Sequence, residues 1–568
     1  MRVVAFNTAH DSSVCSYVDG QIEFYCKEER LSRVKRDKMP YQSLDLYQQQ
    51  NFGHIDHFLY LTPSDIGADD LRQLDYPGLV LDAPDDYGHL YTYIKKKFGC
   101  ELENNSRLTH HTSHASAAFY NSGFSEALVV VIDRNGSYFF GDGGLVLGRE
   151  SESVFKVSYP DNFSEIYKSF WLLEGRKSKS LARRIISQHY GPSVEIGINN
   201  EFGIVLVYEA ATTLIGEDPL ENGKTMGLSS YGKKRNYKSL FLDGHPIGNY
   251  FSFIPPGVSC FYGDEEYLLG RRDDLTEDNY QFYADKAKHV QIETQKESLK
   301  LIKRFVNQTG IKNVCIVGGY GLNVVANNYY IKNSPDINFY FEPLADDSGI
   351  SIGASMLRYR EVTQDSTICP VQDNFYHYYN GDGVKSGDKK SIQDIVDLIN
   401  DQKVVAIFQG SPEAGPRALG HRSLLFDPRN KDGKDIMNTL KRREWYRPFA
   451  GVIMEEHFSS YFKTLGLKKS EYMTINFECK TKTSQYVPSI VHVDNTCRIQ
   501  TVNSGFLYNL LSLFYEQTGC PMLMNTSFNL AGHPLVHSVD DAYQFVDEMK
   551  NNPSFGGVYF VDSGILVS

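Results

Sequence analysis

Short apolar runs separated by polar turns open the chain, a pattern typical of β-strands. The runs RVVAF, VCSYV and IEFYC begin at residues 2, 14 and 22. Asp19-Gly20 lies between the second and the third, and this dipeptide is typical of a tight hairpin. A longer run, ALVVVID, ends at Asp133 and is again followed by a polar, glycine-containing turn and a returning strand. The recurrence predicts an internal duplication in the N-terminal part.

Helical and strand patterns alternate in the rest of the chain. Apolar residues recur at helical spacing over Glu293–Gln308, and Gly310 ends this segment. The following NVCIVGGYGLN reads as a buried strand that runs into a glycine turn. A polar stretch over residues 366–392 is the best linker candidate. The sequence SIQDIVDLINDQKVVAIFQG then predicts a helix and a strand that open a second domain.

Length, composition and charge mainly exclude some classes of protein. At 568 residues the chain is too long for a single core. Its formal net charge of −12 gives no global attraction to nucleic acid or membrane, although a local basic surface remains possible. No apolar run approaches a membrane-spanning length, and the N-terminus lacks a signal-peptide pattern. The nine cysteines are scattered and never form CxxC. We expect a cytoplasmic protein with reduced thiols.

Three histidines in LTHHTSHASAAFYN are the first candidate for chemistry. On a helix, His110 and His114 share one face at i and i+4, whereas His111 points about 100° away. Two imidazoles so placed can bind a metal, and aspartates at strand ends, Asp133 and Asp347, could complete a mixed nitrogen and oxygen site. From the spacing alone, it is equally possible that the histidines are solvent-exposed polar residues near the start of a helix.

The second domain carries a different signal, a group of cations among glycine, proline and aromatic residues. The stretches GPRALGHRS and KRREWYRPF contain Arg417, Arg422, Lys441, Arg442, Arg443 and Arg447. Guanidinium groups match phosphate geometry, so a polyanionic ligand is favoured over a merely solvated face. MNTSFN ends an apolar run in small hydrogen-bonding residues that could cradle a phosphate or a carbonyl group.

Nine segments taken in order resemble the NodU/TobZ family of O-carbamoyltransferases over essentially the whole chain. They include HDSSVCSYVDGQIEFYCKEERLSRVK, HHTSHASAAFYNSGF, ENGKTMGLSSYG, VGGYGLN, EPLADDSG, GPRALGHRS, KRREWYRPFA, HVDNTCRIQTV and NTSFN. The resemblance implies an α/β protein with an actin-like (ASKHA, TsaD-like) domain over residues 1–365. A linker over 366–392 and a YrdC-like domain over 393–568 would follow. The K-x-R and S-x-N signature of YrdC proteins matches Lys441/Arg443 and Ser527/Asn529.

The resemblance also implies a reaction at two sites. Carbamoyl phosphate and ATP, with Mg²⁺, would give carbamoyl-adenylate in the YrdC-like domain, and an acceptor hydroxyl would take the carbamoyl group in the N-terminal domain. The residues expected to bind the anions are Arg417, Lys441, Arg443, Arg447, Arg498, Ser527 and Asn529.

Further residues carry over to the N-terminal domain. The resemblance implies Fe(II), with manganese or zinc as alternatives, on His110, His114, Asp133 and Asp347. Its nucleotide loops correspond to Gly318, Gly319, Asn323, Ser348 and Gly349, and the groups around the transferred carbamoyl correspond to His10, Lys35 and Lys224. We interpret His10 as a general base and Lys35 as an oxyanion stabiliser.

Two stretches depart from the family pattern. The family has Asp-Gly-x-Gly where this chain has Asp133-Arg134-Asn135-Gly136, so a bulky cation lies beside the expected metal. The basic run Gly175–Arg184 is either a solvated helix face or an element that recognises an anionic acceptor.

Several acceptors and two other functions stay open at this point. The acceptor is a small molecule, a sugar, or a nucleotide-type hydroxyl such as hydroxymethylated DNA. TsaD-like transfer to an adenine amine of RNA and a non-catalytic nucleotide-binding scaffold are the alternatives to O-carbamoyl transfer. We expect no membrane association, and a homodimer is possible.

Overall fold

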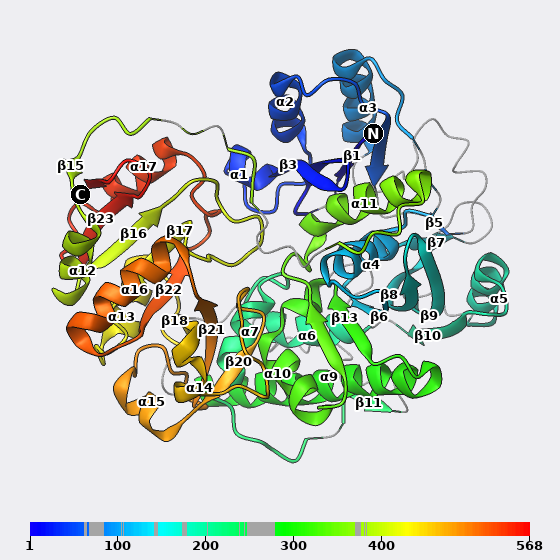
Figure 1. The fold of residues 1–568 in the computed structure, drawn as a ribbon. Helices are drawn as coiled ribbons and strands as arrows, with labels where there is room; N and C mark the ends of the chain where they lie inside the picture. The colour runs from blue at the N-terminus through cyan, green and yellow to red at the C-terminus, as the bar shows by residue number, and fades with distance from the viewer. Residues whose placement is uncertain are drawn as a thin grey trace. The chain divides into compact units, whose positions relative to one another are not determined.

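The computed structural model describes residues 1–8, 10–61, 65–66, 84–103, 105, 107–140, 146–172, 179–200, 203–237, 239–242, 245–246, 279–369, 376–379, 381 and 383–568. The chain divides into two compact units (Figure 1). The first unit comprises Met1–Glu28, Arg36–Leu322 and Asn333–Asp373, and the second comprises Glu29–Lys35, Asn323–Lys332 and Asn374–Ser568. None of the described helices is both long and apolar enough to cross a membrane.

A four-stranded sheet begins the first unit, in the order β3-β2-β1-β4. Its strands are β1 (Arg2–Asn7), β2 (Ser13–Val18), β3 (Gln21–Lys27) and β4 (His57–Leu61). The first three are antiparallel neighbours, and β4 runs parallel to β1. The hairpin predicted at Asp19-Gly20 is confirmed, because both residues have positive φ, 48° and 87°, as a tight turn of that type requires.

The second sheet of this unit repeats the arrangement. Along the path β10-β9-β8-β6-β13-β14, strands β9, β8 and β6 are antiparallel neighbours and β13 runs parallel to β6. The bounds are β6 (Glu126–Ile132), β8 (Val146–Ser158), β9 (Asn162–Leu172), β10 (Glu195–Asn200), β13 (Asn313–Val317) and β14 (Asn338–Phe341). Three antiparallel strands with a parallel strand beside the first therefore occur twice, which is the predicted duplication. The first unit is an α/β domain of the actin-like class.

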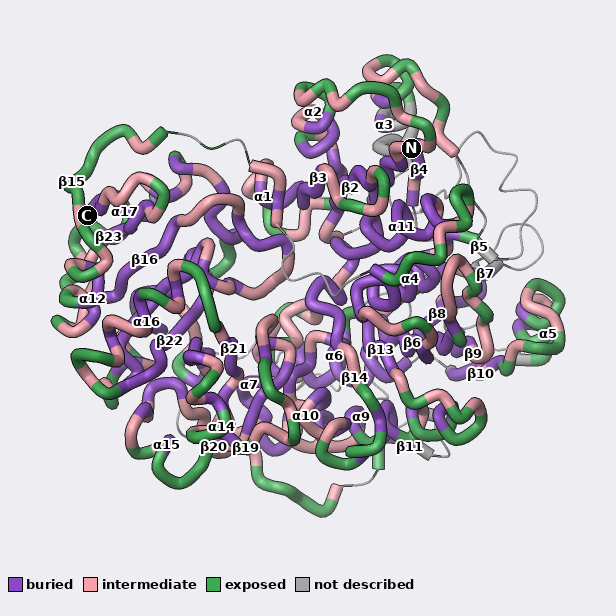
Figure 2. Tube along the Cα trace, in the orientation of Figure 1, coloured by how far each residue is buried: buried purple, intermediate pink, exposed green. Residues whose placement is uncertain are grey.

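Two helices bring the ends of these sheets together. Helix α4 (His110–Asn121) is buried at every residue and packs on α11 (Ile350–Thr363). The two backbones approach closely at Gly353, where a Cβ atom would lie 1.9 Å from Ser113 O. Figure 2 shows β6, β13 and much of α4 among the buried segments. A glycine at position 353 is thus a condition for this packing.

The N-terminal part also contains shorter strands and further helices. They are α1 (Glu28–Ser32), α2 (Tyr41–Gln50), β5 (Asp65–Ile66), α3 (Pro84–Phe98), β7 (Tyr138–Phe140), α5 (Lys179–Tyr190), α6 (Ile204–Leu214), α7 (Asn222–Ser229), β11 (Phe241–Leu242), β12 (His245–Pro246), α9 (Tyr280–Thr309), η4 (Gly319–Leu322), α10 (Val324–Asn333) and η5 (Asp347–Gly349). Helix α9 ends before Gly310 as predicted, with that residue left-handed at φ 74°, but it begins 13 residues earlier (293 − 280) than the expected helix.

A ten-stranded mixed sheet forms the centre of the second unit, in the order β15-β24-β23-β16-β17-β22-β18-β21-β20-β19. The bounds of the strands are β15 (Asp388–Lys389), β16 (Val404–Phe408), β17 (Arg422–Phe426), β18 (Ala450–Met454), β19 (Phe462–Lys463), β20 (Asn476–Cys479), β21 (Thr496–Val502), β22 (Met522–Ser527), β23 (Phe555–Phe560) and β24 (Ile565–Val567). Its helices are α12 (Ile392–Asn400), α13 (Gly433–Lys441), η6 (Glu455–His457), α14 (Phe458–Tyr461), α15 (Thr481–Tyr486), α16 (Gly505–Thr518) and α17 (Val539–Met549). The predicted helix and strand after the linker correspond to α12 and β16.

Segments from the N-terminal part also belong to the second unit. Arg33 donates to Leu535 O at 2.8 Å, and Asn327 Nδ2 donates to Thr474 O at 2.9 Å. The predicted bounds 1–365 and 393–568 placed residues 29–35 and 323–332 in the N-terminal domain, whereas they cluster with the second unit.

Arg422, predicted with the anion-binding cations, has a structural role instead. Its side chain is fully buried, and its guanidinium lies 3.4 Å from the Phe408 ring centroid. The guanidinium donates to the backbone oxygens of Gln409, Gly410, His421 and His537 at 2.8–3.0 Å. These bonds join the segment after β16 to the segment before α17, and they leave Arg422 inaccessible to a polyanion.

Replacing Gly353 by alanine should destabilise the first unit. The new methyl group would meet Ser113 O and Ala117 N, so α4 and α11 must separate. Overpacking of this kind costs about 1–3 kcal/mol or more, which a lowered Tm would report. Gly223→Ala on α7 is the matched control, because a Cβ atom at that position would meet nothing within 4 Å. Equal Tm values for the two variants would contradict the packing argument.

His537 should make the second unit sensitive to mild acid. Burial, followed by Arg422 and Arg30, lowers its pKa to about 3, so the folded state holds it neutral. The stabilising contribution is complete above the unfolded pKa of about 6.5 and is lost as the pH falls from there toward 3. The free energy of unfolding should therefore fall by up to about 1.4 kcal/mol per pH unit on its account.

The variant His537→Gln should flatten this dependence between pH 6.5 and 4, measured by urea unfolding at each pH. His533→Gln changes an exposed histidine nearby and should retain the wild-type slope. Identical slopes for both variants would refute the assignment.

Candidate active site

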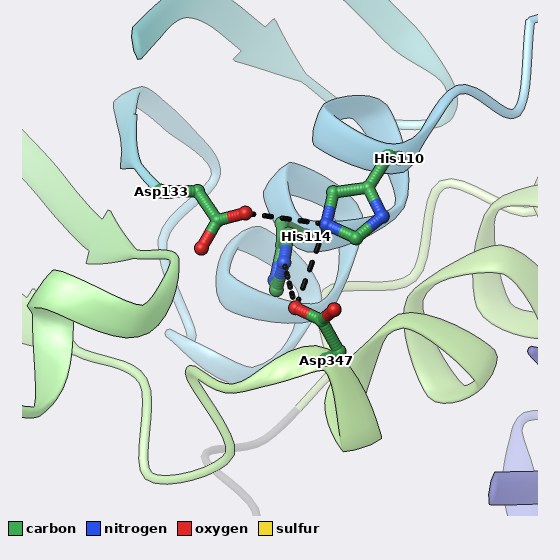
Figure 3. A group of neighbouring side chains, drawn as sticks. All are labelled: His110, His114, Asp133 and Asp347. Carbon is green, nitrogen blue, oxygen red and sulfur yellow. Dashed lines mark ion pairs between the residues drawn. The ribbon is translucent and has the colours of Figure 1, made fainter. Parts of the chain in front are cut away.

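Two histidines and two aspartates converge in the first unit. His110 and His114 lie on α4, Asp133 directly follows β6, and Asp347 begins η5. Figure 3 shows the four side chains pointing toward one another from these three elements. One ligand atom from each lies within 4.8 Å of all the others, and all four residues are buried. The structure thus brings together the residues that the sequence nominated for a metal.

Local structure explains how the two histidines come to share a face. Thr109 caps α4 by accepting a hydrogen bond from Thr112 N at 3.1 Å, so the helix begins at His110. The i and i+4 spacing then brings the two rings together edge to face, with their centroids 4.8 Å apart. The solvated alternative is excluded, because both imidazoles are buried.

The electrostatics of the four residues fit a cation. His110 Nε2 lies 3.3 Å from Asp133 Oδ2 and 3.5 Å from Asp347 Oδ1, and His114 Nε2 lies 3.4 Å from Asp347 Oδ1. The ring nitrogens of both histidines make no hydrogen bond to any described residue. Burial alone would lower the pKa of His110, but Asp347 and Asp133 raise it to about 10.

Both carboxylates are held ionised despite their burial. Burial by itself would raise the pKa of both carboxyls. The histidines nevertheless lower the pKa of Asp133, and His10 and His110 lower the pKa of Asp347 well below its usual range. Two imidazoles with two carboxylates form a donor set suited to iron, manganese or zinc. The residues therefore fit the expected metal, which would replace the protons that otherwise balance the carboxylates.

His111 lies outside this group and belongs to a buried network that the sequence did not reveal. Its Nδ1 lies 2.7 Å from Ser153 Oγ and 3.3 Å from Glu150 Oε1, and burial lowers its pKa. Lys168 Nζ pairs with Glu150 at 2.5 Å and with Glu165 at 2.9 Å. Glu150 and Lys168 are charged residues buried within β8 and β9, and the sequence offered no signal that would have found them.

The network supports the loop that carries Asp133. Ser137 N donates to Glu150 Oε2 at 3.2 Å, and Gly136 N donates to Glu150 O at 2.8 Å. A Cβ atom at Gly136 would lie 2.6 Å from His111 Nε2. His111 therefore explains why the fourth residue of the Asp133–Gly136 turn is glycine.

His10 is the most exposed of the imidazoles near Asp347, with 30% of its side chain accessible. Its Nδ1 lies 3.2 Å from Asp11 Oδ2 and 3.7 Å from Asp347 Oδ2. Lys27 Nζ in turn pairs with Asp11 at 2.5 Å. Burial lowers the pKa of His10, but Asp347 and Asp11 raise it to about 9. Sequence reasoning missed Asp11 and Lys27, although Asp11 adjoins His10 in the chain.

The predicted nucleotide loops of the first unit adjoin the same carboxylates. Gly319 N donates to Asp133 Oδ1 at 3.0 Å, and Gly318, at φ 85°, approaches Ile132 O too closely for a side chain. Ser348 and Gly349 directly follow Asp347 in η5. These four loop residues are thus placed with the metal candidates.

Three further predicted residues have other surroundings. Lys224, on α7, pairs with Glu217 at 2.7 Å and with Glu221 at 2.9 Å. Lys35 and Asn323 fall within the segments that belong to the second unit, where Asn323 Oδ1 accepts from Ala326 N at 3.0 Å. The structure therefore does not group Lys35, Lys224 and Asn323 with His10 by any described hydrogen bond or ion pair.

A second charged group, dominated by cations, lies in the second unit. Lys441, at the end of α13, is buried and donates to Ser527 and Asn529, including Asn529 O at 2.7 Å and Asn529 Oδ1 at 3.0 Å. Burial, then Arg443 and Arg447, lowers its pKa well below the usual range. The K-x-R and S-x-N residues are thereby joined in space.

The arginines of this unit repel one another in the same way. Burial, followed by Arg417 and Arg443, lowers the pKa of Arg498 well below its ordinary value. Arg447 contacts Glu444 at 3.3 Å. Mutual repulsion between the buried Lys441 and the partly buried arginines costs free energy that a bound polyanion would offset. The arrangement is therefore suited to phosphate ligands.

Known proteins resemble this chain in sequence in both units. Residues 258–356 match the family described as carbamoyltransferase N-terminus, and residues 396–558 match carbamoyltransferase C-terminus. The nodulation protein NolNO of Sinorhizobium fredii is 26% identical over 94% of this chain and 76% of its own length. Nodulation protein NolO of Bradyrhizobium diazoefficiens is 26% identical over 77% of this chain and 75% of its own.

Nodulation protein U of Sinorhizobium fredii is 30% identical over 39% of this chain and 40% of its own length. Among solved structures, HypF of T. kodakarensis matches with a TM-score of 0.37 and 11% identity, over 65% of this chain and 49% of that chain. A likeness of that size carries no conclusion about activity. The sequence matches define the class, a carbamoyltransferase enzyme. In sequence the chain is similar to NodU-like carbamoyltransferases in both units.

Removing either ligand histidine should remove the metal. We expect His110→Ala and His114→Ala to lose more affinity than the roughly 10–100-fold that loss of an outer hydrogen-bond partner costs. The variant His111→Ala should keep its metal, because the His111 ring contacts Ser153 and Glu150 instead. Anaerobic loading with Fe(II), followed by elemental analysis, measures this. Loss of metal from His111→Ala alone would reverse the assignment.

Proposed function

We propose that this carbamoyltransferase is an ATP-dependent O-carbamoyltransferase that works in two steps. The observation that carries the proposal is the separation of two sites of opposite character in one chain. Buried cations around Lys441 suit the polyanions ATP and carbamoyl phosphate. Carboxylates and imidazoles around Asp347 suit a cation and proton exchange.

The first step forms the activated donor in the second unit. Carbamoyl phosphate, ATP and one water molecule give carbamoyl-adenylate, pyrophosphate and phosphate. Lys441 and Arg498 would hold the phosphate groups, with Arg417, Arg443 and Arg447 beside them, while Ser527 and Asn529 orient Lys441. Adenylation is needed because carbamoyl phosphate is a poor donor to a neutral alcohol, whereas AMP is a better leaving group.

The second step transfers the carbamoyl group in the first unit. The acceptor oxygen attacks the carbamoyl carbon, the bond from that carbon to the AMP oxygen breaks, and the hydroxyl proton passes to a base. A divalent ion on His110, His114, Asp133 and Asp347 would supply Lewis acidity beside the nucleotide. The glycine loops Gly318–Gly319 and Ser348–Gly349 would bind that nucleotide.

His10 is the residue we propose as the proton acceptor. Its side chain is the accessible imidazole of the group, and Asp11 fixes its ring through Nδ1. Asp347 and Asp11 favour a proton on His10, so it can act as a base only where those charges are offset. Lys35 remains proposed as the group that stabilises the oxyanion, and Lys224 as a neighbour of the transferred group.

A pyrophosphate assay tests the first step directly. Wild-type protein with ATP and carbamoyl phosphate should release pyrophosphate, and Lys441→Met should reduce the rate by at least about 100-fold, since a buried charge contact to phosphate is worth roughly 3 kcal/mol or more. Lys482→Met changes an exposed lysine of α15 in the same unit and should keep the rate. A wild-type protein that releases none would refute the proposal.

A further inference from the structure

Arg134 is the residue at which this chain departs from the family pattern beside the metal candidates. The resemblance predicts glycine directly after Asp133, and a guanidinium group stands there instead. Neither the metal candidates nor the proposed transfer chemistry uses this group. Its position is nevertheless fixed, because Asp133 N donates to Ser151 O at 3.1 Å and Gly136 N to Glu150 O at 2.8 Å.

Glu209, on α6, anchors one edge of the guanidinium. Arg134 Nε donates to Glu209 Oε2 at 2.9 Å, with 3% of the Glu209 side chain accessible against 23% of the Arg134 side chain. Glu209 also interacts electrostatically with His10 and Asp133. The pair therefore belongs to the same neighbourhood as the accessible imidazole.

A second guanidinium converges on the same loop. When the Asn135 amide is oriented so that both of its ends are satisfied, its oxygen accepts from Arg134 Nη1 and from Arg149 Nη1, each at 3.3 Å. Arg149 also stacks over Tyr138, 3.8 Å from the ring centroid. A neutral amide oxygen thus holds two cations close together, an arrangement that an anion stabilises.

A simpler explanation of an arginine at position 134 is that it only balances the charge of Glu209. This explanation is insufficient. Burial raises the pKa of Glu209 to about 7 even though Arg134 and His10 lower it. Arg134 meets Glu209 only through Nε, and a neutral hydrogen-bonding pair would serve the burial of this carboxyl as well. Compensation also leaves the shared contact with Asn135 and Arg149 unexplained.

We infer that Arg134, held by Glu209 and flanked by Arg149, binds a phosphate group of the acceptor. The acceptor of the carbamoyl group is then a hydroxyl compound that also carries a phosphate ester. This inference rests on the proposed transfer function and specifies its substrate class. Arg134 acts as a specificity residue, because the planar guanidinium matches phosphate oxygens in a two-pronged geometry that glycine cannot offer.

Binding to matched pairs of hydroxyl compounds tests the inference. Glucose with glucose 6-phosphate, and thymidine with its 5′-monophosphate, differ only by the phosphate group. Calorimetric titrations use the full chain with Lys441→Met, which disables the phosphate site of the second unit. We expect at least one phosphorylated member to bind at least tenfold more tightly than its neutral partner, and Arg134→Gly to abolish that difference.

Two controls keep the result interpretable. Because Arg134→Gly leaves a buried carboxyl without its partner, the double variant Arg134→Gly with Glu209→Gln removes both charges and should give the same loss with a Tm near that of the parent. Arg304→Ala removes an exposed arginine of α9, which belongs to neither proposed site, and should retain the preference for phosphate.

Two results would overturn the inference. One is a parent protein that binds no phosphorylated member more tightly than its neutral partner. The other is an Arg134→Gly variant that retains the preference. Pyrophosphate release by the wild-type protein is measured in parallel, and its absence would instead indicate failure of the proposed function.

Discussion

Two buried carboxylates facing two buried imidazoles are the constraint on which the first unit depends. Removing charged groups from water costs several kcal/mol each unless a partner of opposite charge compensates. Asp133 and Asp347 come from distant parts of the chain, and His110 Nε2 lies within 3.5 Å of a carboxylate oxygen of each. The surrounding packing must hold all four in place, which explains the tight approach of α4 and α11.

The rigidity of this group comes from a second layer of buried charge. Glu150 and Lys168 are completely buried and paired, and Glu150 also binds the backbone of the turn that follows Asp133. Such a pair contributes little net stability compared with apolar packing, but removal of one partner is strongly destabilising. The pair matters here for geometry, because it holds in place the loop that carries Asp133, whose carboxylate lies against the histidines of α4.

The two units contain charged groups of opposite sign. In the second unit, repulsion among Lys441, Arg498 and their neighbours suits the binding of polyanions. In the first, clustered carboxylates prepare a site for a cation and hold protons on the histidines. One site with both characters would neutralise itself. A reaction that first activates carbamoyl phosphate and then transfers the carbamoyl group can use each character separately.

Much of the local structure and part of the site could be predicted from the sequence alone. The Asp19-Gly20 hairpin, the end of α9 at Gly310 and the shared face of His110 and His114 follow from short-range backbone preferences and helical period. Spacing alone left the histidines divided between ligand and surface roles, with Asp133 and Asp347 as possible partners at strand ends. The whole-chain resemblance then favoured all four as ligands.

Tertiary structure decided which charged residues are buried and what each contacts. Arg422 and Lys441 occur in similar basic stretches, yet Arg422 binds backbone carbonyls within the fold while Lys441 meets Ser527 and Asn529. Glu150 and Lys168 likewise show no helical or strand-specific signal. Local periodicity determines which face of an element a residue occupies, but its electrostatic environment depends on the elements that pack against that face, and these come from remote parts of the chain.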